Sequence, residues 1–154
     1  MERFLNMTTY KQIQLTNTQV GDVSVDSFLP LGNVTRRINS PSNCCNTFIV
    51  TSSNVDTVTV TTPGFYKITY SLTATTADAG TVTVGLLTNG TNVYSVSSVT
   101  TAADSPVNIT LPYTIRVCPN CSSVPTNIPV NIQLQLSGTA ITGTSSNLIV
   151  EKVG

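Results

Sequence analysis

Residues 56–75 constrain the fold of this chain most strongly, because their side chains alternate between two faces. A period of two is typical of β-strands that bury one face. Proline fixes φ and glycine accepts positive φ, so Pro63-Gly64 predicts a turn between two strands. After this turn the predicted inner face holds Tyr66, Ile68, Tyr70, Leu72 and Ala74, and the outer face holds Phe65, Lys67, Thr69, Ser71 and Thr73.

Several other segments alternate in the same way. The clearest is 108–117, where Pro112 lacks an N–H and therefore predicts an edge strand or a bulge. Asn89-Gly90 is typical of a tight hairpin turn. Residues 137–147 are mostly small and predict a loop. Roughly eight to ten short strands result, which favours a sandwich or jelly roll. The other predicted strands cover 10–16, 23–28, 47–51, 82–86, 93–100, 130–136 and 148–153.

The composition fits one all-β domain of 154 residues that has no recognisable helix. Only 9% of residues are charged and the formal net charge is zero. The seven Lys and Arg are scattered along the sequence, which predicts no nucleic-acid partner. The one basic pair, Arg36-Arg37, is expected in a solvated loop.

No membrane or secretion signal is evident in the sequence. No stretch approaches the roughly 20 apolar residues that a membrane-spanning helix needs. Residues 1–15 also lack the apolar run of a signal peptide. We therefore expect a protein that needs no membrane, made in a cytoplasm and exported by another route, such as release of an assembled particle.

We divide the chain into an N-terminal arm, residues 1–40, and a β-sandwich, residues 41–154. Two interpretations of residues 1–35 remain open. They form a frayed terminus with a first edge strand, or they form an arm that docks on another protein or threads into a trimer.

The order of these segments resembles the trimeric jelly rolls of the tumour-necrosis-factor and complement-globular-head superfamily. The resemblance covers about residues 45–154 and is carried by Gly64-Phe65-Tyr66-Lys67-Ile68-Thr69-Tyr70, the Asn89-Gly90 turn, the strand at 107–117 and the final apolar strand. It implies an antiparallel jelly-roll β-sandwich that assembles as a homotrimer. Domains at the tips of bacterial exosporium filaments and on bacteriophage fibres look similar, because they share low-charge strands rich in Thr, Ser and Asn.

Tyr66, Tyr70 and Tyr113 are the candidate trimer-interface residues. Tyrosine combines a large apolar ring with a polar tip, which suits an interface. The alternative is that the three rings fill the core of a single chain.

The four cysteines form the only cluster in the sequence that could bind a metal or form a covalent bridge. Cys44-Cys45 and Cys118-x-x-Cys121 could hold a structural zinc ion through four thiolates, although adjacent cysteines diverge on an extended backbone. A disulfide between the two loops is the favoured interpretation, and free thiols are the third.

An enzyme is not expected. The chain has no histidine, and its acids form no paired motif. We predict no cofactor. The first hypothesis is a structural protein of a virion surface (a phage head fibre, decoration or fibre-head protein) that docks on a capsid or fibre protein through residues 1–40.

Two further hypotheses remain. In one, the loops 77–80, 101–106 and 118–129 gather at one end of the sandwich and bind a host-surface glycan or receptor. In the other, the chain is a tip module of a bacterial spore or cell surface.

Overall fold

The computed structural model describes residues 11–39, 47–50, 55–89, 92–118 and 129–154, and these residues form β-strands and no helix. Sheet A contains β1 (Lys11–Asn17), β2 (Gly21–Val23), β3 (Asn33–Asn39), β6 (Gly64–Thr75), β9 (Pro106–Val117) and β11 (Ile141–Lys152). Sheet B contains β4 (Phe48–Ile49), β5 (Val58–Val60), β7 (Gly80–Thr88), β8 (Asn92–Thr101) and β10 (Val130–Ser137). This all-β architecture confirms the predicted fold class.

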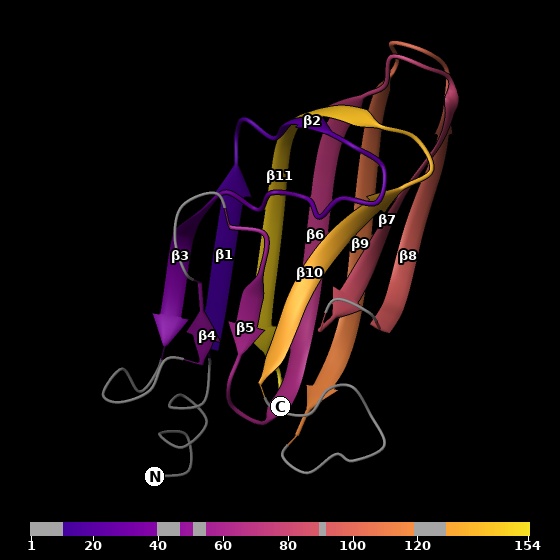
Figure 1. Cartoon of the computed structure of the whole chain (residues 1–154). Helices are drawn as coiled ribbons and strands as arrows, with labels where there is room; N and C mark the ends of the chain where they lie inside the picture. The colour runs from indigo at the N-terminus through magenta and orange to yellow at the C-terminus, as the bar shows by residue number, and fades with distance from the viewer. Residues whose placement is uncertain (1–10, 40–46, 51–54, 90–91, 119–128) are drawn as a thin grey trace, which may run out of the picture.

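The two antiparallel sheets face each other as a sandwich (Figure 1). Sheet A has the order β3-β1-β11-β6-β9, with β2 paired to β11, and sheet B has the order β4-β5-β10-β7-β8. The connections β6–β7 and β8–β9 lie at one end, which we call the upper end after its place in Figure 1. β9 and β11 finish at the opposite, lower end.

The core lies between the sheets and is built from alternating side chains. Along β6 the predicted inner face is buried throughout, and none of the five residues on the predicted outer face is. β9 and β10 alternate in the same way, so the sequence periodicity of all three strands is confirmed. Burial of these aliphatic and aromatic side chains is the main stabilising contribution to the fold.

Two local predictions are also confirmed. Asn89 has a φ of 53° at the end of β7, and β7 pairs with β8 as a hairpin. Asparagine tolerates this left-handed conformation better than most residues. Pro112 lies on β9, the edge strand of sheet A, where a missing N–H costs no ladder bond on the open side.

The turn at Pro63-Gly64 joins two sheets and does not close a hairpin. β5 pairs with β4 and β10 in sheet B, whereas β6 pairs with β9 and β11 in sheet A. Gly64 has a φ of 149°, and a Cβ atom there would come 2.6 Å from Lys152 Cε. The chain therefore uses glycine to cross from one sheet to the other beside the end of β11.

The predicted loop at 137–147 is wrong over most of its length. β11 begins at Ile141, pairs with β2 at residues 141–143 and pairs with β6 from Thr142 onward. A register shift between Gly143 and Ser145 interrupts this ladder. Backbone pairing on both sides holds the segment as a strand, although its small side chains carry little apolar alternation.

The basic pair Arg36-Arg37 lies in strand β3 and not in a loop. The Arg37 guanidinium donates a hydrogen bond of 2.7 Å to the Phe48 carbonyl of β4. This bond joins the outer edges of the two sheets, so Arg37 has a structural role.

Residues 11–39 belong to the sandwich. β1 lies between β3 and β11, and Ile13 and Leu15 are fully buried. A strand with partners on both sides is part of the sheet and does not act as an arm. An arm therefore remains a proposal only for the first ten residues, which lie outside the described part of the chain.

Candidate functional site

Tyr66 and Tyr70 fill the core of a single chain. Both side chains are fully buried. The Tyr66 ring meets Phe48 edge to face at 5.9 Å between centroids, and its hydroxyl donates to the Thr62 carbonyl at 2.9 Å. Burial raises the pKa of Tyr66, and a side-chain hydrogen bond with Thr62 partly offsets this rise. Neither ring is exposed for contact with a second copy of the chain. Both residues therefore match the alternative interpretation, in which the rings fill the core of a single chain.

The two buried hydroxyls have different surroundings. The Tyr70 hydroxyl lies deep in the core, where burial raises its pKa and the neighbouring Ser146 hydroxyl lowers it slightly. No hydrogen bond of ordinary geometry to the Tyr70 or Ser146 hydroxyl occurs within the described residues. The Tyr66 hydroxyl, in contrast, also lies 2.8 Å from Thr62 Oγ1.

We expect the two Tyr→Phe substitutions to have different effects on stability. Tyr66→Phe removes the hydrogen bond from a buried hydroxyl to the Thr62 carbonyl, at a cost of about 1–2 kcal/mol. Tyr70→Phe removes an unsatisfied hydroxyl, so the free energy of unfolding stays constant or rises by up to about 1 kcal/mol. Urea unfolding of both variants measures the difference, and equal losses would contradict these hydroxyl environments.

Tyr113 occupies a different position. It is half-buried on the edge strand β9 and packs against the rim of the core. Part of its ring therefore remains accessible beside the open edge of sheet A. Of the three candidate interface tyrosines, Tyr113 is the one whose placement suits contact with another chain.

Cys118 is disulfide-bonded and nearly buried at the end of β9. Its sulfur is therefore not a free thiolate in this structure. Cys44, Cys45 and Cys121 lie outside the described residues, so the pairing between the loops stays a prediction. No metal-binding group of three His, Cys, Asp or Glu side chains occurs within the described ranges.

Reduction should destabilise the chain if Cys118 closes the large loop to Cys44 or Cys45. A disulfide over such a loop contributes about 2–4 kcal/mol by restricting the unfolded chain. A bridge to Cys121 would close a loop too short for an effect of that size. Urea unfolding with and without a phosphine reductant measures the effect, and peptide mapping under non-reducing conditions identifies the partner. A Cys118–Cys121 peptide would contradict the pairing between loops.

Two of the three loops predicted to gather at one end lie together. The connections at 77–80 and 101–106 lie at the upper end, where Thr75 pairs with Pro106. Cys118 follows Val117, which pairs with Gly64 at the lower end. The antiparallel direction of β9 therefore places the loop 101–106 and Cys118 at opposite ends, and residues 119–128 of the third loop lie outside the described part of the chain.

A shallow groove of about 300 Å³ lies at the upper end between β2, the β6–β7 connection and the start of β11. Asp22 Oδ1 accepts a hydrogen bond of 2.7 Å from Thr142 Oγ1 in this groove. Of the residues that line this groove, the loop predicted at 77–80 contains only Ala77. The others could not be predicted to lie together, because only the pairing of β2 with β11 brings them side by side. The groove is lined by Asp22, Val23, Ser24, Ala77, Ala140, Ile141 and Thr142.

No family model matches this chain, and no curated protein matches its sequence. Solved structures match it over nearly its whole length. Eiger TNF from S. frugiperda is 9% identical with a TM-score of 0.65, over 94% of this chain and 92% of that one. The chain has the TNF-like jelly-roll fold. The globular domain of zebrafish complement 1qA is 3% identical with a TM-score of 0.62, over 93% of this chain and 96% of that domain.

The same jelly-roll fold is shared with PRD1 vertex protein P5. That structure is 14% identical to this chain with a TM-score of 0.53, and the match covers 94% of this chain and 97% of the other. Identities this low establish the fold alone. Among the described residues no helix is both long and apolar enough to cross a membrane.

Proposed function

We propose that this chain is a non-enzymatic structural protein of a virion surface, such as a phage head fibre, decoration or fibre-head protein, and that it acts as a homotrimer. The observation that carries the proposal is the TNF-like jelly-roll fold, in which this chain resembles a protein named for a vertex. The resemblance of the sequence to the tumour-necrosis-factor and complement-globular-head superfamily implies three copies around an axis. The first ten residues then serve as the attachment segment to a capsid or fibre protein.

The shape of the sandwich supports an oligomer. β8 and β9 are the edge strands of the two sheets on the same side of the molecule, and they are 10 and 12 residues long. Long open edges are sites of unwanted pairing unless they are covered or protected. A neighbouring copy that covers this side would protect both edges at once, and Tyr113 lies on it.

Tyr113→Ala should weaken the trimer more than it weakens the fold. Removing a half-buried interface ring costs about 2 kcal/mol or more of association energy per contact. We expect light scattering to show monomer at micromolar concentrations where the wild type is trimeric. Tyr113→Phe is the matched control and should remain trimeric. A Tyr113→Ala variant with unchanged mass and melting point would remove Tyr113 from the interface.

The groove at the upper end supports a second function, binding of a host-surface glycan. Its volume is at the lower limit for small-ligand sites, and it combines apolar walls with the Asp22 carboxylate and the Thr142 and Ser24 hydroxyls. A glycan array tests this function with Asp22→Ala as the control. Hits that persist in Asp22→Ala, or no hits for the wild type, would contradict binding in the groove.

Immunogold labelling tests the virion location directly. Particles released from cells that carry the chain in its native genome should bind antibody at discrete surface positions. Label on the cell or spore envelope, with unlabelled particles, would instead support the tip-module alternative.

A further inference from the structure

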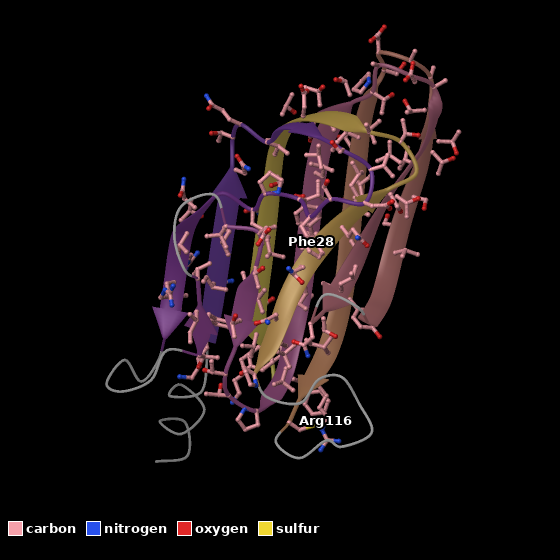
Figure 2. All side chains as sticks on the ribbon, in the orientation of Figure 1. Phe28 and Arg116 are labelled. Carbon is pink, nitrogen blue, oxygen red and sulfur yellow. The ribbon has the colours of Figure 1, made fainter. Side chains whose placement is uncertain are left out.

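The basic side chains converge at the lower end of sheet A, although they are scattered in the sequence. Arg3 lies outside the described residues, and the other six of the seven Lys and Arg are all on sheet A strands. The antiparallel register brings together strand starts and strand ends from distant parts of the chain, and Figure 2 labels Arg116 at this end. The six residues are Lys11, Arg36, Arg37, Lys67, Arg116 and Lys152.

The aspartates lie mainly at the upper end. Asp22 pairs with Thr142 beside the start of β11, and the Asp26 N–H donates to the Leu136 carbonyl at 2.8 Å. Asp78 lies in the β6–β7 connection, and the Asp104 N–H donates to the Thr76 carbonyl at 2.7 Å. These four aspartates are exposed, as is the fifth, Asp56, which precedes β5 in sheet B. Glu151 lies opposite Lys67 in the β6–β11 ladder, so one acid stands among the six cations at the lower end. The zero net charge therefore combines an excess of cations at the lower end with four aspartates at the upper end.

Two exposed apolar side chains adjoin the basic residues. Phe65 is 48% exposed and Val153 is 56% exposed. The Arg116 guanidinium carbon lies 6.0 Å from the centre of the Phe65 ring. The backbone holds this arrangement, because the Phe65 N–H donates to the Gly154 carbonyl at 2.9 Å and the Val153 N–H donates to the Phe65 carbonyl at 2.8 Å. Exposed aromatic rings beside arginine are typical of interface anchors.

We propose that this lower-end patch, formed by Phe65, Lys67, Arg116, Lys152 and Val153, docks on an acidic protein surface that accepts an apolar side chain. The acidic upper end then points away from the partner. This inference rests on the proposed function in one respect, because it takes the partner to be a protein of the particle that carries the chain.

The charge distribution favours one orientation of docking. An acidic surface attracts the lower end and repels the upper end, so the field of the chain turns the molecule before contact. In a trimer with parallel copies, three lower ends would lie together and the preference would increase. A protein partner fits better than nucleic acid, because Phe65 and Val153 make part of the patch apolar and the carboxylates at the other end repel an extended polyanion.

Binding of the full chain to immobilised synthetic polypeptides tests the docking surface. The probes are poly-L-glutamate and a random copolymer of glutamate and tyrosine, measured at 50 mM and 300 mM NaCl. We expect binding to both, tighter by at least about threefold for the copolymer, and weaker at high salt because charge contacts are screened. Lys67→Gln/Arg116→Gln/Lys152→Gln should weaken binding to both probes by about tenfold or more at 50 mM NaCl.

Two controls separate this surface from general charge effects. Ala79→Glu/Ala102→Glu/Ala103→Glu changes the net charge by the same amount at the upper end and should alter binding less than about threefold. Phe65→Ser should abolish the preference for the copolymer while leaving poly-L-glutamate binding in place. Circular dichroism confirms that each variant is folded.

Three results would overturn the proposal. These are unchanged binding by the lower-end variant, an equal loss in the upper-end control, and tighter binding to a single-stranded oligothymidylate than to either polypeptide. None of these probes is a particle component, so such a failure leaves the trimer and the virion location to their own tests.

Discussion

Tyr66→Ala should destabilise the fold by about 3–5 kcal/mol, which is a large part of the roughly 5–15 kcal/mol that stabilises a typical domain. The substitution removes a fully buried ring, its edge-to-face contact with Phe48 and its hydrogen bond to Thr62. For a domain of this size, the melting temperature should fall by roughly 6–20 °C. Urea unfolding at two protein concentrations measures the effect.

Phe65→Ala is the matched control for this prediction. Phe65 precedes Tyr66 on β6, carries a ring of similar size and projects from the opposite face with 48% exposure. We expect its loss to cost less than about 1 kcal/mol. A core residue changes stability equally at both protein concentrations, whereas an interface residue does not. A Tyr66→Ala chain that becomes monomeric but unfolds at the wild-type urea concentration would place Tyr66 in the interface.

Gly32→Ala should cost about 2–5 kcal/mol. Gly32 has a φ of 84°, a conformation that costs an L-residue about 1–2 kcal/mol. A Cβ atom there would also overlap the Thr16 carbonyl oxygen and come 2.7 Å from Asn17 Cβ. Backbone atoms of β1 cannot move aside without disturbing the ladder that β1 makes with β3 and β11, so overpacking adds to the conformational cost.

Gly21→Ala isolates the conformational part of this cost. Gly21 has a φ of 78°, but nothing lies within 4 Å of its added Cβ atom. We expect it to lose only about 1–2 kcal/mol. The difference between the two variants in chemical unfolding then measures the close approach of the 31–32 segment to β1. Equal losses at Gly21 and Gly32 would show that the chain relaxes around the added methyl group.

The strands that could be predicted from sequence are those with one buried and one solvated face. β6, β9 and β10 alternate over 8–12 residues, so their inner faces follow directly from the period of two. The first half of β11 consists mostly of small residues and has no such alternation of apolar side chains. It is a strand because its backbone pairs with β6 and β2. Backbone hydrogen bonds to neighbouring strands leave no periodic pattern in the side chains, so this half of the strand could not be predicted from the sequence.

The candidate surfaces were harder to predict for a related reason. Lys11, Lys67 and Lys152 are far apart in sequence, and only the register of sheet A brings them to one end. The buried positions of Tyr66 and Tyr70 follow from the same inner face that the sequence predicted, but alternation alone does not distinguish a core from an interface. The direction of β9 likewise separates the loop at 101–106 from Cys118.

We propose that this jelly roll assembles as a homotrimer. The most direct test is the solution mass of the full chain, measured by light scattering on a size-exclusion column over a range of micromolar concentrations. The chain has a mass of 16.3 kDa, so we expect three times that value, about 49 kDa. A mass near 16 kDa at every concentration would contradict the trimer and would leave a monomeric sandwich whose long β8 and β9 edges need another explanation.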